Sequence, residues 1–268
     1  MNTKTAYKAF NPDFACRDFQ YEVGKSYKHD GIVEACASGF HSCEYPLDVF
    51  SYYEPSNLVL AEVSVSGDIK THVTDSKLAS SEINIIKEIS FNELATAAVE
   101  YITKNVSSES GVYMTSDRSV VTNTVNYSVA TNTVNYSVAT NTGSQSVATN
   151  TGIQSVATNI GGQSVASNIG KFSTATNTGD NSAATNTGNN SAAVNIGYKS
   201  TACVSGSDSV AVATGSQSKA KASEGSAIVL VYRDDNMKIV HGVFKIAGVD
   251  CKADTYYTLS ETGELVEC

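Results

Sequence analysis

Hydrophobic and polar positions alternate strictly through the middle of this chain. From Ser119 to Ser218 a serine returns every nine residues, and it is followed, with few exceptions, by Ala two positions later, Asn four later and Gly six later. Alternation with period two, ended by a glycine, is typical of a short strand and a turn, and it excludes a helix. A fixed period of this kind predicts a β-solenoid, in which each unit gains a core only by stacking on its neighbours.

The constant positions of the repeat predict which face of each strand is buried. Ser, Ala and Asn share one parity and are expected inside, whereas the opposite face varies among Val, Thr, Ile, Ala and Lys. Stacked Asn amides are expected to bond to one another in ladders, and Gly to supply the backbone angles of the turn. Two nine-residue units in each coil give about six coils over residues 119–226, and a rod of about 29 Å.

The two ends of the chain follow other patterns. Residues 227–268 form ordinary amphipathic strands with turns, which we interpret as a C-terminal β-cap over the open edge of the solenoid. Residues 1–106 hold most of the aromatic residues and mix strand and helix patterns, which predicts a small α+β domain. The strands are expected at 19–27, 39–43, 57–67 and 82–89, and the helices at 46–53 and 91–103. Residues 107–118 are expected to be a linker, and the fold class is mainly β.

Charge and composition exclude several classes of function. The formal net charge is −9, with acidic ends and a nearly neutral middle, so the chain lacks the basic surface that nucleic-acid binding needs. We find neither eighteen consecutive apolar residues nor a signal peptide, which predicts no membrane span and a location in a host cytoplasm or a virion. The six cysteines are too sparse for a disulfide framework and fit a reducing compartment.

Three stretches of the N-terminal region carry a resemblance to a known family. With "CRDFQYEVGKSY", "SGFHSCEYPLDVFSYY" and "AEVSVSGDI" ahead of polar repeats, the chain resembles a family of uncharacterised phage and prophage proteins. The resemblance implies an origin in a mobile element and no established activity. Separately, residues 209–227 resemble the head repeats of trimeric autotransporter adhesins, which raises the expectation of a homo-oligomer formed through the solenoid, although the period here is nine.

The segment "GFHSC…VFSYY", followed by the strand "LAEVSV", more weakly resembles the core of the ADP-ribosyltransferases. That resemblance implies NAD as the cofactor and Glu88 as the catalytic acid. The first strand, "TAYKAF", departs from the family pattern because it has no Arg or His, and Lys8 is its nearest polar residue. We find no clear Glu-x-Glu or Gln-x-Glu pair either, so the fold can be shared without the chemistry.

Two further combinations of residue types are candidates for chemical sites. Cys16, Cys36, His41 and Cys43 match a Cys3His zinc set in composition but lack the Cys-x2-Cys spacing that shapes most such sites, so no metal is expected. A nucleophilic Cys–His pair among them lacks an activating context. Core thiols and a hydrogen-bonded histidine are the simpler interpretation.

These observations predict a binding or structural protein more than an enzyme. The leading hypothesis is a phage or prophage protein without a cofactor, whose N-terminal domain is presented on the solenoid and binds a host or virion protein. Aromatic residues with a polar group dominate many interfaces, which selects Tyr21, His41, Tyr52 and Tyr53 as candidate contacts, with the domain core as the alternative role for each. The alternative hypothesis is an ADP-ribosyltransferase-like or nucleotide-binding protein that uses Glu88.

Overall fold

The strands of the chain form two structural units. The structure is a computed structural model that describes residues 3–72, 75–105, 111–114 and 117–268. One unit contains Met1–Tyr53 and Asn57–Tyr101, and the other contains Glu54–Ser56 and Ile102–Cys268. The fold is mainly β, with a small α+β N-terminal domain and a β-solenoid of about 6 turns, as the repeat pattern predicts.

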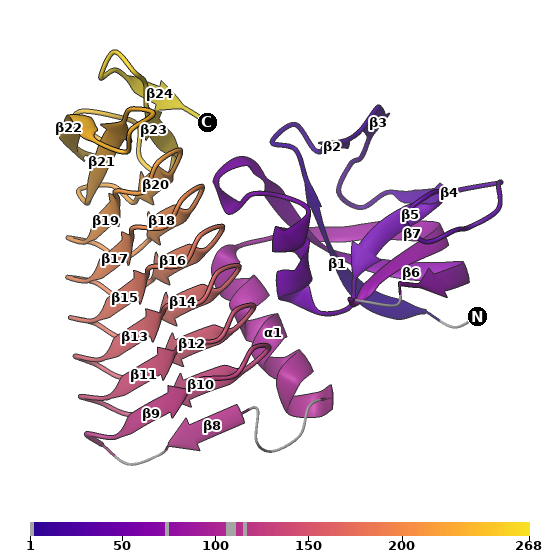
Figure 1. The fold of residues 1–268 in the computed structure, drawn as a ribbon, viewed down its shortest axis with the longest axis horizontal. Helices are drawn as coiled ribbons and strands as arrows, with labels where there is room; N and C mark the ends of the chain where they lie inside the picture. Colours follow the sequence, from indigo (N-terminus) through magenta and orange to yellow (C-terminus); the bar gives the residue numbers. More distant parts are fainter. Residues whose placement is uncertain (1–2, 73–74, 106–110, 115–116) are drawn as a thin grey trace. The chain divides into compact units, whose positions relative to one another are not determined.

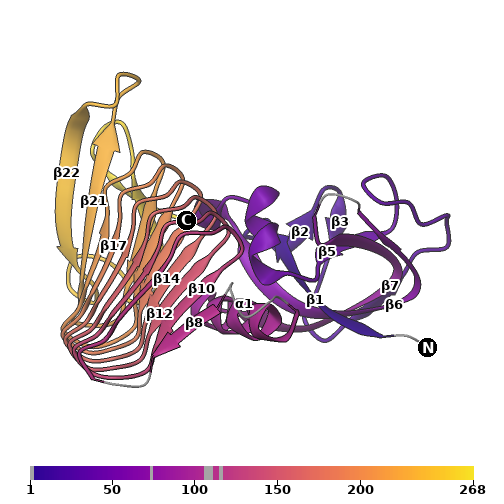
Figure 2. The same ribbon diagram turned by 60° about the horizontal axis from the view of Figure 1, so that its bottom comes forward.

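The N-terminal domain is built on a sheet that closes on itself. Its strands pair in the order β4-β7-β5-β1-β6, and β6 also pairs with β7, so β7, β5, β1 and β6 form a ring. Figure 2 shows the long strands β6 and β7 curving through this domain. The strands are β1 (Lys4–Phe10), β4 (Ser26–Lys28), β5 (Phe40–Cys43), β6 (Val59–Thr71) and β7 (Lys77–Ile89). This closure makes a small barrel, whose interior is filled by side chains that alternate along each strand.

The remaining elements of the domain are short, apart from one helix. A minor two-stranded sheet joins β2 (Ala15–Cys16) to β3 (Phe19–Gln20), and two 3-10 helices, η1 (Pro46–Ser51) and η2 (Pro55–Asn57), follow β5. Helix α1 (Phe91–Asn105) begins after a capping box, in which the Ser90 N–H donates to Glu93 Oε2 (2.8 Å) and the Glu93 N–H donates to Ser90 Oγ (3.3 Å). The expected strand at 19–27 is divided between β3 and β4.

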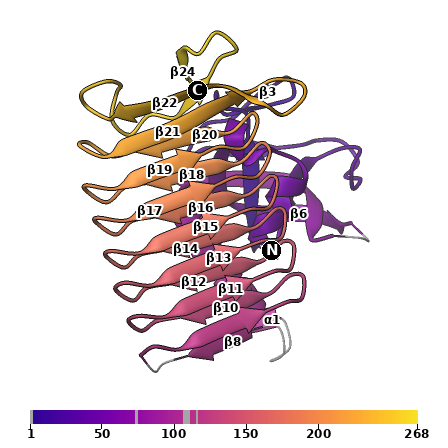
Figure 3. The same ribbon diagram turned by 60° about the vertical axis from the view of Figure 1, so that its left-hand side comes forward.

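The solenoid consists of parallel strands that alternate between two sheets (Figures 1 and 3). Each strand pairs in register with the strand eighteen residues later, as in Val129↔Val147 and Val138↔Val156. The strands are β9 (Val120–Asn123), β10 (Val129–Asn132), β11 (Val138–Asn141), β12 (Val147–Asn150), β13 (Val156–Asn159), β14 (Val165–Asn168), β15 (Thr174–Asn177), β16 (Ala183–Asn186), β17 (Ala192–Asn195), β18 (Thr201–Val204), β19 (Val210–Ala213) and β20 (Lys219–Ala222). One coil therefore contains two repeats.

The inside of the solenoid is made from the constant residues of the repeat. Repeat Ala side chains such as Ala148 and Ala166 are 0% exposed, and so are Asn150 and Ser146. The expected Asn–Asn ladder is wrong for these amides, because Asn141 Nδ2 donates across the coil to the Ser128 carbonyl (3.1 Å). Serines form a ladder instead, in which each Ser N–H donates to the Ser Oγ one coil later, at 3.0–3.1 Å in the central coils. Most buried polar groups of the solenoid are thus satisfied without stacked amides, and the exceptions among the described residues are Thr131 Oγ1, Thr149 Oγ1 and Asn159 Oδ1.

The repeat glycines are required for a reason other than the one expected. None of the glycines from Gly143 to Gly215 has a positive φ. A Cβ on Gly152 would lie 1.8 Å from the carbonyl oxygen of Val134 in the preceding coil, so the glycine permits close approach of two backbones. The left-handed position of the turn is taken two residues later by a residue with a side chain, such as Gln154 (φ 55°). Sequence periodicity does not separate these two uses of glycine.

Both ends of the solenoid carry further strands. β8 (Gly111–Met114) lies within the segment expected to be a linker and pairs in parallel with β10, while residues 107–110 and 115–116 of that segment lie outside the described residues. At the C-terminus, β21 (Ala227–Arg233) continues one sheet and pairs with β22 (Ile239–Ile246), and β23 (Tyr257–Leu259) pairs with β20 and with β24 (Leu265–Glu267). Ile228, Leu230, Tyr257 and Leu259 pack with the last alanines as one core.

Within the described part of the chain, no helix is both long enough and apolar enough to span a membrane.

Candidate functional site

A cavity of about 710 Å³ lies in the N-terminal domain. All four residues that the sequence selected as candidate contacts, Tyr21, His41, Tyr52 and Tyr53, line it. The mouths of small β-barrels are common places for ligand sites, because the strands hold the walls while the connecting loops vary. The cavity is therefore the candidate site of this domain.

Three local features place the candidate side chains. His41 lies on β5, which begins directly after Gly39. The φ of Gly39 is +95°, and a Cβ at this position would lie 2.9 Å from the Ser80 carbonyl oxygen, so both the backbone conformation and the space exclude a larger residue. Tyr52 and Tyr53 follow η1, which Pro46 begins. The Tyr21 ring packs against Phe10 with 5.0 Å between ring centroids. Tyr21 is thus partly a core residue, whereas Tyr52 is 43% exposed.

Lys8 contributes a buried amine to the cavity. It lies on the inward parity of β1 between Ala6 and Phe10 and is 5% exposed. Its Nζ donates to the backbone carbonyl of His41 (2.9 Å) and lies 3.7 Å from Cys16 Sγ. Burial lowers the pKa of Lys8, and the nearby ammonium of Lys77 acts in the same direction, while Cys16 and Cys43 oppose it.

The Cys16 thiol links Lys8 to Tyr53. The Tyr53 hydroxyl donates to Cys16 Sγ at 3.0 Å. Burial, followed by this hydrogen bond, raises the pKa of Tyr53, so the phenol stays protonated at neutral pH. The three side chains form a connected polar group at the cavity wall.

His41 is held in the neutral form. Its Nε2 accepts a hydrogen bond from the Cys36 backbone N–H (3.0 Å), which places the ring proton on Nδ1. Burial lowers the pKa of His41 to about 4, and Lys77, Lys8 and Arg17 add to the effect. A neutral imidazole with an occupied Nε2 is a hydrogen-bond donor through Nδ1.

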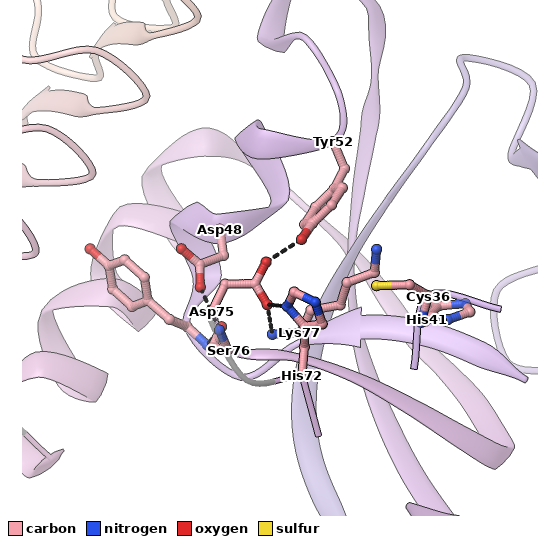
Figure 4. A network of polar contacts seen from close by, with 9 residues as sticks. Cys36, His41, Asp48, Tyr52, His72, Asp75, Ser76 and Lys77 are labelled. Atoms are coloured by element: carbon pink, nitrogen blue, oxygen red, sulfur yellow. Dashed lines mark hydrogen bonds and ion pairs between the residues drawn. The ribbon is translucent and has the colours of Figure 1, made fainter. Parts of the chain in front are cut away.

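A second polar group surrounds Asp75 (Figure 4). Its carboxylate accepts hydrogen bonds from the Tyr52 hydroxyl and from the Lys77 backbone N–H (3.0 Å), and its Oδ1 lies 2.9 Å from His72 Nδ1. These hydrogen bonds lower the pKa of Asp75 despite an opposing effect of burial. The Lys77 ammonium lies 4.0 Å from the centroid of the Tyr52 ring. Asp75 thus fixes the orientation of Tyr52 at the cavity edge.

The charges that line the cavity are mostly positive, although the whole chain is acidic. Among the described residues that line it, the cations are Lys8, Arg17, Lys28 and Lys77, and the carboxylate is Asp18. Aromatic rings also line it: Tyr7, Phe19, Tyr21, Phe40, Tyr52 and Tyr53. A cavity with cations and rings is chemically suited to an anionic ligand that has a planar part.

Two buried polar atoms of the lining have no hydrogen-bond partner among the described residues. Ser42, which is 3% exposed, has no hydrogen-bond partner for its Oγ, and neither does His29 for its Nε2. Most buried polar atoms in folded proteins are hydrogen-bonded, so each such atom in a cavity is a candidate contact for a ligand.

The residues of the two alternative hypotheses lie in different places, one outside the cavity lining and the others within it. Glu88 lies on β7 opposite Ala61 of β6, is exposed, and is not part of the cavity lining. Cys16, Cys36, His41 and Cys43 all line the cavity, but within the described residues no group of three or more His, Cys, Asp or Glu side chains could hold a metal ion. Burial raises the pKa of Cys43, which keeps its thiol protonated.

Sequence reasoning missed Lys8, Arg17, Ser42 and Asp75 as site residues. Lys8 had a readable signal, because a lysine at the inward parity of an otherwise apolar strand is rarely buried without a role. Arg17 and Asp75 are brought to the site by loops, whose paths are not encoded in local patterns.

Comparison with known proteins gives one match. No curated protein and no solved structure matches the chain. Residues 4–97, which span the barrel and the first seven residues of α1, match a family model described as a domain of unknown function, DUF7666. The cavity lies wholly within the matched residues, so the N-terminal domain is similar to a family that has no assigned activity.

Proposed function

We propose that the chain is a non-enzymatic binding protein of phage or prophage origin, whose N-terminal domain binds a host or virion partner. The observation that carries the proposal is the common cavity of Tyr21, His41, Tyr52 and Tyr53. In this proposal the partner inserts an anionic group into the cavity, and the solenoid is a rigid support for the domain. The proposed phage or prophage origin is supported only by the resemblance to uncharacterised phage proteins.

Electrostatics supports an anionic ligand. The cations of the lining outnumber its carboxylate, and Lys8 is held away from solvent, where an anion gains more than it does in water. A negatively charged protein repels anions at long range, so the local cations also give selectivity for ligands small enough to enter.

A second candidate function is nucleotide binding, which the aromatic and cationic lining also favours. Transfer chemistry in the manner of the ADP-ribosyltransferases has less support, because the proposed acid Glu88 is outside the lining. Under this candidate NAD binds without turnover.

Calorimetry of the full chain tests the proposal with three probes: pyridoxine 5′-phosphate, uncharged pyridoxine, and NAD. We expect the phosphate to bind more tightly than pyridoxine, and Lys77→Met to weaken its binding about tenfold, since a hydrogen bond to a charged group contributes about 1.5–3 kcal/mol. Lys25→Met is the matched control, because Lys25 is exposed and outside the lining. Equal affinity for charged and uncharged probes would contradict an anion site. Turnover of NAD that Glu88→Gln abolishes would establish an enzyme instead.

A further inference from the structure

We propose that Lys8 is a covalent attachment point for a carbonyl compound that also carries an anionic group. In this site the Lys8 amine condenses with an aldehyde or ketone bound in the cavity of the N-terminal domain. The inference rests on the proposed function, because the same cavity binds the ligand, and it adds the ligand's chemical class.

The position of the amine supports this chemistry. Lys8 Nζ has two hydrogen-bond partners among the described residues, the His41 carbonyl at 2.9 Å and Cys16 Sγ at 3.7 Å. An ammonium group has three N–H donors, so one N–H, or the lone pair of the neutral amine, is left for the cavity that the residue lines. The described surroundings of Nζ contain no carboxylate hydrogen-bonded to it that would hold the amine protonated.

Burial favours the reactive form of the amine. The lowered pKa of Lys8 increases the fraction of neutral amine at neutral pH. The groups that face Nζ are Cys16, Cys43 and Lys77, of which only Lys77 adds to the lowering by burial. Lysines desolvated in this way serve as nucleophiles toward carbonyl groups.

The reaction needs no oxidant or reductant. The nitrogen lone pair attacks the carbonyl carbon, the π electron pair moves to oxygen, and a carbinolamine forms. Loss of water then gives a C=N double bond, and both hydrogens of that water come from the amine. The product is a reversible imine between Lys8 and the ligand.

The rest of the lining fits the remainder of such a ligand. The ring centroid of Tyr21 lies 5.5 Å from Lys8 Nζ, so a planar group attached to the carbonyl carbon has an aromatic neighbour. Arg17 supplies charge for an anionic substituent, and so does Lys28, whose Nζ also lies 3.7 Å from Glu82 Oε1. Ser42 Oγ, which is buried and has no partner among the described residues, offers a hydrogen bond to the ligand.

Reductive trapping of the full chain tests the proposal. The probe is pyridoxal 5′-phosphate, an aldehyde with a ring and a phosphate, followed by borohydride and peptide mapping by mass spectrometry. We expect fixed label at Lys8 to exceed that at the exposed Lys25 by about tenfold or more, because a ligand bound in the cavity is held beside Lys8, whereas Lys25 meets the aldehyde only from solution. Lys8→Met should lose this label and keep the label at Lys25.

Two further measurements keep the outcomes separate. Label at Lys8 no greater than at Lys25 in the unsubstituted protein would overturn the proposal, whether or not Lys8→Met folds. Pyridoxine 5′-phosphate lacks the aldehyde, so its binding without any trapping at Lys8 would leave the anion site standing and refute the imine. Absence of binding by both phosphates would refute the anion site itself.

Discussion

At the scale of single residues, the site is defined by two basic groups whose pKa values are lowered by burial. His41 and Lys8 are both less basic than in water, because burial and neighbouring cations disfavour their charged forms. The cavity therefore holds the neutral imidazole of His41 beside fixed cations. An anionic ligand would reverse part of this effect by favouring protonation.

The titration of His41 predicts a loss of stability in acid. Its pKa is about 4 in the folded protein and 6.5 without perturbation, so protons bind more tightly to the unfolded chain. The stabilising contribution is complete above pH 6.5 and is lost as the pH falls from 6.5 to about 4. We expect His41→Gln, which retains an acceptor for the Cys36 N–H, to show a smaller decline in the free energy of unfolding over that range. Denaturant unfolding at several pH values measures it, and parallel curves for the two proteins would contradict the assignment.

Asn177 tests the interior of the solenoid. Its Nδ2 donates to the Ser164 carbonyl (3.1 Å), and its Oδ1 accepts from the Gly179 N–H (3.0 Å). Asn177→Leu leaves the buried Gly179 N–H without this partner, at about 1–3 kcal/mol, while the Ser164 carbonyl keeps the hydrogen bond from the Ala183 N–H (3.0 Å). Thr176→Leu is the control, because Thr176 is partly exposed on the outward parity of the same strand. Thermal unfolding should show a much larger loss for the Asn177 variant, and equal losses would mean that the two faces are reversed.

The sequence predicts the role of a single residue when that role depends on residue type or on near neighbours in the chain, and not when it depends on a distant contact. Tyr21, His41, Tyr52 and Tyr53 were selected by residue type, and the structure places them around one cavity. Lys8 was noted only as the nearest polar residue of its strand. Its role depends on the His41 carbonyl, which lies 33 positions away in the chain, and local periodicity does not encode that contact.

At the scale of elements, each solenoid turn combines two backbone constraints that the repeat separates by two residues. Gly152 allows close approach to the preceding coil, whereas Gln154 adopts the left-handed conformation. The strands were predictable because alternation with period two is a strong signal. The division of the turn was not, because a glycine in a sequence is compatible with either constraint.

Opposite substitutions in one turn separate the two constraints. Gln154→Gly removes the steric strain of a side chain on a left-handed residue. We expect the free energy of unfolding to rise by between zero and about 1 kcal/mol, because the larger backbone entropy of glycine in the unfolded chain offsets part of the strain removed. Gly152→Ala places a Cβ against the Val134 carbonyl and should cost about 1–3 kcal/mol or more. Chemical denaturation of both variants measures these two changes in the free energy of unfolding. A neutral Gly152→Ala would show that the coils can move apart.

At the scale of the whole molecule, the two units differ in how their contacts are distributed along the sequence. The solenoid pairs strands at a constant separation of eighteen residues, so its class followed from periodicity alone. The barrel closes through the pairing of β1 with β6 and of β6 with β7, and no sequence repeat predicts these pairs of strands. An α+β class was therefore predictable for residues 1–106, and a closed sheet was not.

Removal of the C-terminal strands tests their role as a cap. Deletion of residues 227–268 would remove β21 from β19 and β23 from β20, and would bare the hydrogen-bonding groups of both sheet edges. We expect the shortened chain to aggregate as its concentration rises, which light scattering measures. A soluble monomer at high concentration would contradict the capping role.

The separation of eighteen residues between stacked strands also limits how the length of this chain can vary in evolution. Gain or loss of two repeats at once would leave every later strand in its own sheet and would change only the number of coils. Gain or loss of one repeat would transfer every later strand to the opposite sheet, so that β21 would arrive in the sheet that now holds β20, β23 and β24. We therefore expect duplications within the gene to add nine-residue repeats two at a time. The structure requires the number of repeats to stay even or odd as it is, and it does not require one particular number.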